Sequence, residues 1–428
     1  MVKAAIALSL IAGLANSVRA QDKIMPIDIK TVLKLAGSSN LDVAEINARY
    51  ELAKAQQLEA KEWMIPTVSP GVLLMSYQGI AQATDGTFVD VDKNSFWAGV
   101  NVTSEWDLGN AVYSYLAAKQ NVESVGYEKM VEQNRANVQA VQSFYDLSAA
   151  QSKLVALEKV ALKSEDIVTQ IALQVEQGIT YKSDLLLAKS NLNHIKIEVS
   201  KARSAIQRNS HELLELLNIS DNVQLLVSDS LLIPVNLVDT SKVEFSSAFD
   251  KRPELMVFNS RIEGFKIDRK SQTTGLLLPN VNFGLNNGPY GPYFSPEGNA
   301  LNYYVGAKWE IPLGALFYGG TKKAFDARIR IAGINVDRAK NEIRREIQDE
   351  QMNLQTSKVR MKLAESSVAF ASEGLDQSIE RQRLGTAIPL EVIRAQEQMM
   401  EAELDLIDAV TQYNKAQYSL YIALGNNP

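Results

Sequence analysis

Apolar residues recur at helical spacing along most of the chain. Between Asn110 and Gln177 there is no proline and a single glycine, while apolar positions repeat every three, four and seven residues. A second stretch of this kind extends from Thr321 to Leu384 and is followed by a shorter helical one. A helix of about 68 residues would extend roughly 100 Å, at 1.5 Å per residue. The pattern therefore predicts long helices that need partner helices along their length.

Two segments between the helical stretches alternate with a period of two instead. From Phe96 to Leu108, apolar residues on one face alternate with polar and charged residues on the other. The segment Tyr303–Ile311 has the same alternation, and each segment follows a partner segment that ends in a polar, turn-rich loop. The pattern predicts two β-hairpins, at about 66–108 and 279–312.

The two halves of the chain match one another in order and spacing. Gly178 precedes Gly385 by 207 residues, and Asp184 precedes Glu391 by the same number. Asn40–Pro66 and Pro253–Pro279 have equal length, and we interpret the whole as a tandem duplication. We expect a first repeat (21–219), a linker (220–249) and a second repeat (250–428). In each repeat a long helix is followed by a shorter helix that runs back beside it, called the return helix. The long helices are expected at about 110–177 and 321–384, and the return helices at about 182–218 and 388–425.

The first twenty residues have the order of a secretory signal peptide. Lys3 provides a positive charge, Ala4–Leu14 is apolar, and small residues precede Gln21. We therefore expect export of a chain that begins after residue 20. No later stretch reaches the roughly 18 to 20 apolar residues that a membrane-spanning helix needs.

Composition excludes several classes of function. The chain has no cysteine, so we expect no disulfide, no thiolate chemistry and no acylated cysteine of a lipoprotein. A net charge of −6 without basic clusters argues against nucleic acid as a partner. The two histidines, His194 and His211, lie in a helical pattern and are expected on a solvated face rather than at a metal. No motif of an enzyme or of a cofactor site occurs, so we expect neither.

Two hairpins cannot stand alone in a membrane. An isolated hairpin is marginally stable, and lipid requires that every strand edge be closed. Four strands are too few for a barrel with a channel, so a membrane interpretation requires several copies, and three copies give an even count of twelve. A small soluble sheet packed on a helix would show the same alternation, and the strands alone leave that alternative open.

The strands lead into the long helices through residues that permit a sharp change of backbone direction. These junction residues are Gly109, Pro312, Gly314, Gly319 and Gly320. One turn then links each long helix to its return helix. We therefore expect both hairpins at one end of the protomer and both turns at the other.

Several short motifs, in this order, carry a resemblance to a known family. They are KRPEL (251–255), LPNVNFG (278–284), PLGALFYGGTKKAFDAR (312–328) and the paired turns in which a glycine precedes an acidic residue by six positions. With these motifs the chain resembles the TolC-like outer-membrane efflux proteins from about Ile27 to Gly425.

The resemblance implies a mostly α fold with a β-barrel part. Three chains would contribute two hairpins each to one twelve-stranded barrel in the outer membrane of a Gram-negative bacterium, and their helices would form a periplasmic tunnel. Such proteins are passive exit ducts of efflux or type I secretion systems. Their partners are a periplasmic adaptor and an inner-membrane pump or ABC transporter.

The resemblance also places functional residues at the periplasmic tip. Adaptor docking is expected at the two turns, which contain Gly178, Ile179, Thr180, Leu384, Gly385 and Thr386. Asp184 and Glu391 correspond to carboxylates of the pore constriction, although a carboxylate also stabilises the first turn of any helix. Arg394 stands where the family has a second acidic residue, and Gln382 and Ala387 replace its gate tyrosine and arginine. A double acidic ring and that gate are therefore not carried over.

A second class of function also fits the helices and turns. A non-channel periplasmic coiled-coil adaptor or structural spacer would need the same long helices. An adaptor has one helical hairpin, however, whereas this sequence predicts two, each preceded by aromatic alternating strands.

Overall fold

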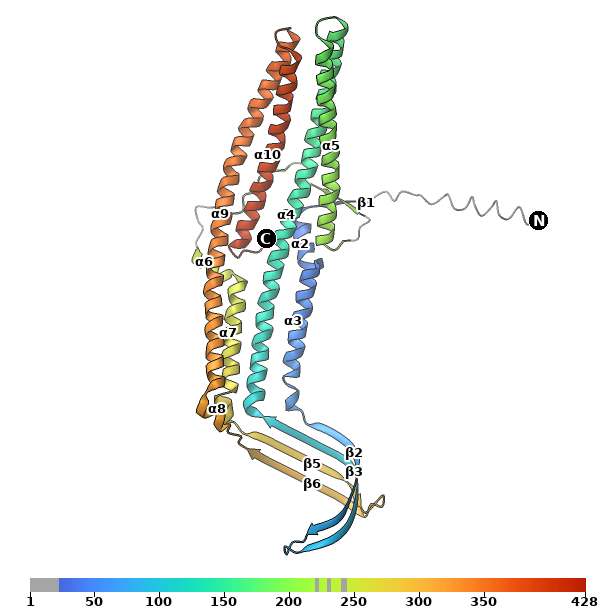
Figure 1. Cartoon of the computed structure of the whole chain (residues 1–428), viewed down its shortest axis with the longest axis vertical. Coiled ribbons are helices and arrows are strands. Elements are labelled where there is room, and N and C mark those ends of the chain that lie inside the picture. Colours follow the sequence, from blue (N-terminus) through green and yellow to red (C-terminus); the bar gives the residue numbers. More distant parts are fainter. Residues whose placement is uncertain (1–22, 220–222, 229–231, 240–244) are drawn as a thin grey trace, which may run out of the picture. The chain divides into compact units, whose positions relative to one another are not determined.

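The computed structural model describes residues 23–219, 223–228, 232–239 and 245–428. The chain divides into two compact units, and each unit takes segments from both sequence repeats (Figure 1). The helical unit comprises Met1–Glu45, Met130–Arg252 and Asn341–Pro428, and the sheet unit comprises Ile46–Lys129 and Pro253–Lys340. The expected signal peptide, residues 1–20, lies outside the described residues.

Long helices make up most of the described chain. They are α4 (Leu108–Glu176), α5 (Lys182–Leu216), α9 (Gly320–Arg383) and α10 (Pro389–Ala423). Shorter helices are α2 (Ile29–Ser39), α3 (Leu41–Glu59), α6 (Phe245–Lys251), α7 (Pro253–Ser271) and α8 (Leu313–Tyr318), with single turns η1 (Glu62–Met64) and η3 (Thr274–Leu277). The return helices α5 and α10 have the same length, 35 residues.

The two return helices end in the same way. Asn218 after α5 and Gly425 after α10 have positive φ angles of 51° and 78°. The amide of Ile219 donates to the carbonyl of Leu214, and the amide of Asn426 donates to that of Tyr421. This is the Schellman ending, in which a left-handed residue, usually Gly and sometimes Asn, satisfies the last carbonyls of a helix. The ends of the helices thus preserve the duplication where the residue type has changed.

The end of each return helix also binds the residue that precedes an earlier helix of its repeat, Asn40 before α3 and Arg252 before α7. Asn40 caps α3 by accepting from the amides of Asp42 and Val43, and its own amide donates to the carbonyl of Leu216 over 3.0 Å. At the corresponding place in the second repeat, the buried Arg252 guanidinium donates to the carbonyl of Ala423 over 2.9 Å. Different side chains therefore satisfy the same exposed helix end.

The largest core cluster of the helical unit joins α2, α4 and α5. Its fully buried members include Val32, Leu147, Leu213 and Leu217. Tyr145 and Tyr418 meet here with ring centroids 5.9 Å apart, and burial raises the pKa of both phenols. Further along the unit, separate apolar clusters fill the space between α4, α5, α9 and α10.

A short parallel strand pair, which the sequence pattern did not predict, lies against this core. Strand β1 (Lys23–Ile27) pairs with β4 (Val223–Val227), which belongs to the expected linker. Gln151 of α4 accepts from the amide of Val227 and donates to the carbonyl of Leu225, and Ser210 accepts from the amide of Leu225. Side chains of two helices thus satisfy backbone groups of β4.

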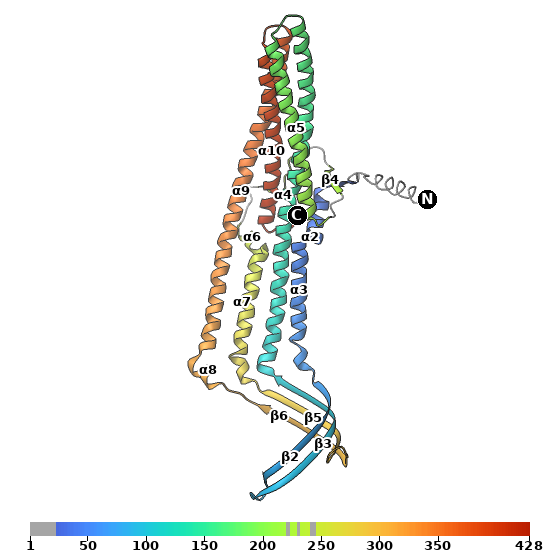
Figure 2. The same ribbon diagram turned by 45° about the vertical axis from the view of Figure 1, so that its right-hand side comes forward.

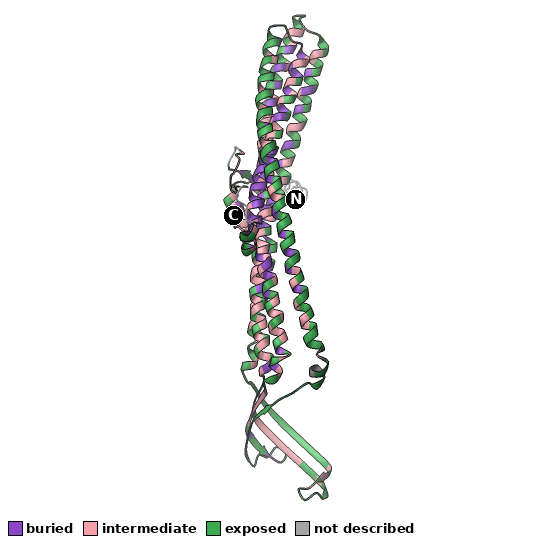
Figure 3. Ribbon diagram, turned by 90° about the vertical axis from the view of Figure 1, so that its left-hand side faces the viewer, coloured by how far each residue is buried: buried purple, intermediate pink, exposed green. Residues whose placement is uncertain are grey.

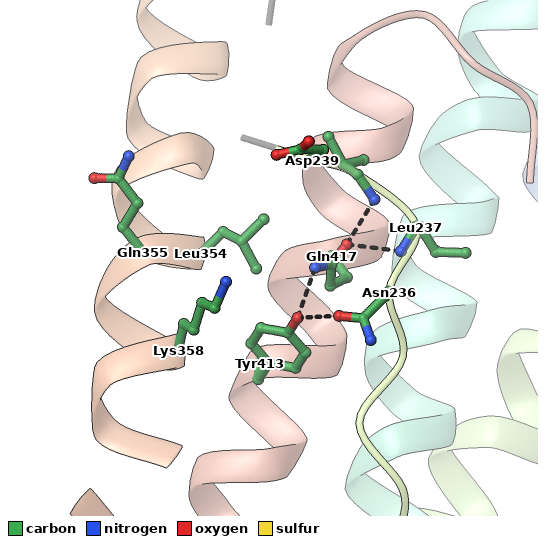
Figure 4. Close-up of a pocket in the computed structure, with 9 residues that line it drawn as sticks. Asn236, Leu237, Asp239, Leu354, Gln355, Lys358, Tyr413 and Gln417 are labelled. Carbon is green, nitrogen blue, oxygen red and sulfur yellow. Dashed lines mark hydrogen bonds between the residues drawn. The ribbon is translucent and has the colours of Figure 1, made fainter. Parts of the chain in front are cut away.

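The linker continues as an extended segment that is held on α10 by side-chain amides (Figure 4). Gln417 accepts from the amides of Leu237 and Val238, both at 2.9 Å. Asn414 accepts from the amide of Val235 and donates to the carbonyl of Ile233. Because a loop without secondary structure leaves backbone groups unpaired, these contacts fix its path over the helix.

The sheet unit contains one antiparallel four-stranded sheet in the order β2–β3–β5–β6. The strands are β2 (Thr67–Gln82), β3 (Phe88–Asp107), β5 (Asn280–Gly291) and β6 (Gly298–Lys308). The two expected hairpins are present, and β3 also pairs with β5, which joins the repeats. The predicted fold class, long helices with two β-hairpins, is confirmed.

The two strand-to-helix junctions differ in detail. Strand β3 passes directly into α4 at Leu108, whereas β6 ends at Lys308. Trp309 and Ile311, which the alternation placed on the strand, lie in the segment before α8. The second junction then turns again at Gly319, which has a φ of 59°, before α9 begins.

Removal of the Asn40 side chain tests the helix-end contact. Asn40→Ala loses the helix cap and leaves the Leu216 carbonyl without its partner, so we expect a loss of about 1 to 3 kcal/mol in unfolding free energy. Thermal unfolding followed by circular dichroism measures this loss. Ser38→Ala, at an exposed residue that bonds only within α2, is the control, and equal melting of the two variants would contradict the assignment.

Candidate functional site

The four strands share one apolar face, which the pairing register defines. Successive side chains of a strand point to opposite faces, so residues at every second position of the paired strands lie together on one face of the sheet. The apolar residues of this face are Val68, Pro70, Val72 and Leu74 of β2, Phe96, Ala98, Val100, Val102 and Trp106 of β3, Val281, Phe283 and Leu285 of β5, and Leu301, Tyr303, Val305 and Ala307 of β6, and the polar residues Ser104 and Asn287 lie among them.

Much of the apolar face is exposed in the single chain (Figure 3). The side chains of Val72, Tyr303 and Val305 are 65%, 75% and 73% exposed. Apolar side chains gain about 25 cal/mol for each Å² removed from water, so an uncovered row of this kind indicates a surface that another phase or molecule covers.

The opposite face of the sheet is polar. Its polar residues between the helices and the level of Leu74 are Thr67, Ser69, Asn101, Thr103, Glu105, Asp107, Asn280, Asn282, Asn286, Asn302 and Lys308, with Gly71, Gly99, Gly284, Gly288 and Gly306 among them. The pair Leu73 and Trp97, next to Leu74, is apolar. The ring of Tyr304 lies directly over Gly284, where a Cβ would overlap it. The sheet thus separates an apolar side from a polar side.

Both outer edges of the sheet are unpaired in the described chain. Strands β2 and β6 each have a neighbour on one side only. An exposed edge presents a row of unsatisfied amides and carbonyls, which pair readily with another strand. None of the described helices is both long enough and apolar enough to cross a bilayer.

The turn between α4 and α5 and the turn between α9 and α10 have the same geometry. Gly178 and Gly385 have φ angles of 70° and 75°, and the residue after each donates its amide five residues back, from Ile179 to Gln174 and from Thr386 to Arg381. Only glycine adopts this conformation without a Cβ penalty, so each glycine ends its long helix in a Schellman motif.

The tip carboxylates have different partners in the two turns. Asp184 accepts from the hydroxyl of Thr180 over 2.7 Å. Glu391 forms an ion pair with Arg381 at 3.0 Å, and both side chains are about half exposed. The sequence had not identified Arg381, because an ion pair across a turn leaves no periodic signal.

The remaining tip residues are placed on and beside these turns. Arg394 is exposed on α10, one turn after Glu391. Gln382 is buried and donates to Gln174 of α4 over 3.4 Å, so it joins the two long helices rather than standing free. The apolar side chains at the turns are exposed instead, and they are Ile179, Tyr181, Leu384 and Ile388.

Two of the junction glycines, Gly109 and Gly319, have identifiable roles. Gly109 lies in the first turn of α4, where a Cβ would overlap the backbone of Gly275, and a Cβ on Gly275 would in turn approach the carbonyl of Gly109. Gly109 therefore permits close packing rather than an unusual backbone angle, and the sequence had not identified its partner. Gly319 has a positive φ angle, whereas Gly314 and Gly320 have open space around them. Pro312 lies between β6 and α8.

The described residues offer no site for a metal. They contain no group of three or more histidine, aspartate or glutamate side chains that could hold an ion. His194 and His211 are both exposed on α5.

Comparison with solved structures identifies this arrangement. The crystal structure of a membrane protein from Pseudomonas aeruginosa matches with a TM-score of 0.79, at 17% identity over 95% of both chains. The chain has the TolC-like outer-membrane channel fold. The CmeC outer membrane channel of Campylobacter jejuni matches this chain with a TM-score of 0.76, at 16% identity over 93% of this chain and 85% of that one. The outer membrane protein VceC of Vibrio cholerae matches with 0.74, at 15% identity over 93% and 96%.

No protein-family model and no curated protein matches the sequence. At 14 to 17% identity, the similar structures establish the fold of the TolC-like chain. The predicted resemblance is confirmed at that level.

A glycine pair with a matched control tests the junction of the TolC-like fold. Gly109→Ala places a methyl group against the Gly275 backbone, so we expect lower thermal stability despite the usual gain of about 0.5 to 1 kcal/mol when a helical glycine becomes alanine. Gly264→Ala, in α7 with open space around it, should show that gain. The melting temperatures of the two variants measure the difference, and a stabilised Gly109→Ala would contradict the close packing.

Proposed function

We propose that this chain is the protomer of a trimeric exit duct that crosses the outer membrane and the periplasm of a Gram-negative bacterium. The observation that carries the proposal is the exposed apolar face on a sheet with two unpaired edges. Lipid covers such a face, and a closed barrel pairs such edges. The chain would act as a passive channel and not as an enzyme.

The size of the sheet favours three copies. Along β3, the apolar face extends from Phe96 to Trp106, which suits the 9 to 11 tilted residues that cross a bilayer as a strand. Two copies would give eight strands, whose interior is just filled by side chains. Three copies give twelve strands, and at a spacing of about 4.8 Å and a tilt of about 40° such a barrel is about 24 Å across between backbones. That leaves an open lumen behind the polar face.

The helical unit provides a second surface for copies of the chain. Met352, Val359, Leu363 and Phe370 of α9 are all exposed, and they follow one another at spacings of seven, four and seven residues. This is the spacing of a coiled-coil seam, which needs a facing helix. A helix of a neighbouring copy would cover the seam and close the helical part of the duct.

The two glycine turns are proposed as the site of adaptor docking. They contain Gly178, Ile179 and Thr180 in the first repeat and Leu384, Gly385 and Thr386 in the second. Their exposed apolar side chains are unusual for turns, which are ordinarily polar. A periplasmic adaptor would cover them and connect the duct to an inner-membrane pump or ABC transporter of a tripartite efflux or type I secretion system.

The carboxylates beside these turns are proposed to line the periplasmic constriction. Three copies of Asp184 and Glu391 around an axis would give a negative potential that favours cations. The ion pair with Arg381 reduces the contribution of Glu391, and Arg394 adds positive charge nearby. The constriction would therefore be less cation-selective than a purely acidic one.

The alternative of a non-channel periplasmic adaptor or spacer explains the helices and the turns. It gives no reason for an apolar face of four strands that nothing in the described chain covers. A spacer would fractionate with soluble periplasmic proteins, whereas the duct would fractionate with outer membranes as a detergent-stable trimer.

A charge on the apolar face tests its contact with lipid. Leu301→Arg places a guanidinium in the hydrocarbon layer at the level of Val100, at a cost of about 2 to 4 kcal/mol per copy near the midplane. We expect loss of the trimer from the outer-membrane fraction. Asn302→Arg, on the polar face of the same strand, is the control and should assemble. Equal assembly of both variants would contradict the proposed orientation.

Removal of one ion-pair partner tests the constriction. Arg381→Gln leaves Glu391 without its counter-charge, so we expect stronger cation preference in planar bilayers, measured as a shift in reversal potential in a salt gradient. The double variant of Asp184→Ala and Glu391→Ala should weaken that preference. Arg383→Gln removes an equivalent charge that pairs with Glu380 within α9, and it serves as the control. Unchanged selectivity in the first two variants would mean that these carboxylates do not line the pore.

A further inference from the structure

The β2–β3 hairpin extends well beyond the rest of the sheet. Pairing between β3 and β5 ends at Phe96, whereas β2 and β3 remain paired as far as Gln82 and Phe88. The extension is defined here as residues 75–95, and its eight residues in β2 correspond to about 26 Å at 3.3 Å per residue. Figure 2 shows it turning away from the direction of β5 and β6.

The polarity of the two faces reverses at the base of the extension. Below it, Val72, Leu74, Phe96 and Ala98 form part of the apolar face. Beyond it, the same side of the hairpin carries mainly polar residues, which are Ser76, Gln78, Gln82, Asp90, Asp92 and Asn94, with Ile80 and Phe88 as its apolar members. A one-residue slip cannot explain the change, because the register is continuous from Thr67 to Gln82.

The opposite side of the extension becomes apolar at the same level. Below it, this side is the polar face, with Gly71 and Gly99 paired across the strands, and the change begins at the next pair, Leu73 and Trp97. Beyond it, the side carries Met75, Tyr77, Gly79, Ala81, Val89 and Val91, and these residues are called the inner face from here on. Lys93, opposite Tyr77, is its one charged residue among the described positions.

Aromatic residues of the β5–β6 loop mark the level of the reversal. Phe294 contacts Phe96 with ring centroids 5.7 Å apart, and the hydroxyl of Tyr293 accepts from the amide of Asn94 over 2.8 Å. Exposed aromatic rings at the end of an apolar band are typical of the membrane–water boundary of a barrel. The extension therefore begins where lipid would end.

The backbone of the extension is bent. Gly79 within β2 has a φ of 130°, and the hydroxyl of Tyr77 donates to the carbonyl of Ile80 over 2.7 Å across this glycine. Gly79, Ala81 and Val91 of the inner face are partly buried, whereas Met75, Tyr77 and Val89 on the same face are 58%, 49% and 43% exposed. Because the Tyr77 side chain lies on the inner face and spans Gly79 to reach the Ile80 backbone, it favours a bend toward that face.

We propose that the inner faces of three β2–β3 extensions meet over the outer mouth of the barrel and form an extracellular constriction. This inference rests on the proposed trimeric duct. In a barrel about 24 Å across, the polar face of the sheet lines the lumen. The inner face lies on the same side of the hairpin and continues the lumen wall beyond the membrane. An extension of about 26 Å exceeds the barrel radius of about 12 Å, so a hairpin bent toward its inner face reaches the axis.

The occupant of the inner face is another copy of the same hairpin because only symmetry places a matching apolar surface there. In a cyclic trimer, each copy presents the same patch to the axis. The outer side keeps Asp90 and Asp92 in water, and Asp92 accepts from the amides of Gln78 and Asn94. Lys93 lies at the wide base of the extension, where its long side chain can keep the ammonium in water. Contact is therefore expected toward the tip, at Ala81 and Val89.

A cysteine pair on adjacent residues tests the contact, since the chain has no cysteine of its own. Val89→Cys lies on the inner face, and Asp90→Cys lies next to it on the outer side. A disulfide requires Cα atoms within about 7 Å, so only contacting copies form one. In a trimer one disulfide joins two copies and leaves the third copy free. After oxidation and denaturing electrophoresis without reductant, we therefore expect a linked dimer with residual monomer for Val89→Cys and monomer alone for Asp90→Cys.

Conductance in planar bilayers is measured on the same two variants. We expect the oxidised Val89→Cys channel to conduct less than after reduction, and the Asp90→Cys channel to be unaffected by reduction. A variant in which Asn-Gly replaces residues 77–93 removes the constriction and should form trimers with higher conductance than the natural chain.

The outcomes separate the two proposals. If trimeric channels form but Val89→Cys does not cross-link and the shortened hairpin conducts like the natural chain, the constriction is wrong and the duct stands. Equal cross-linking of both cysteines would overturn the assignment of the inner face. If no trimer and no channel form with the natural chain, both the duct and the constriction fail.

Discussion

The rest of the structure depends on one feature of the four-stranded sheet. Its apolar face and both of its outer edges are uncovered in the single chain and have to be covered. Helices α3 and α7 lead into the strands and α4 and α9 lead out of them, yet Val72 and Val305 remain largely exposed. A protein with such a face is stable only where lipid and further strands cover it. The proposed membrane location, the proposed copies of the chain and the proposed lumen all rest on this feature.

The second constraint is the reversal of the chain at two glycines. Gly178 and Gly385 end helices of 69 and 64 residues in the same hydrogen-bonded motif, and each long helix is followed by a return helix of 35 residues. The exposed apolar side chains and the paired carboxylates of the tip follow directly from these turns. The duplication is preserved most closely at such helix ends, because the geometry of a Schellman ending tolerates few residues.

The sequence predicted features with a periodic or steric signature. The strand alternation, the long proline-free helices and the glycine turns at 178 and 385 belong to this group. It could not predict β4, because a five-residue strand in a linker has no period and its partner lies about 200 residues away. The Arg381–Glu391 pair and the contact between Gly109 and Gly275 depend on tertiary geometry. The reversal of polarity in residues 75–95 also needs the register, since only pairing shows that Tyr77 and Val91 share a side.

Single-channel recording of the unmodified protein in planar bilayers tests the central claim most directly. The purified, detergent-stable trimer should insert and give discrete conductance steps of uniform size, because three sheets close one lumen of fixed width. Absence of discrete channels from a verified trimer, at either voltage polarity and across a range of pH and salt, would contradict the account.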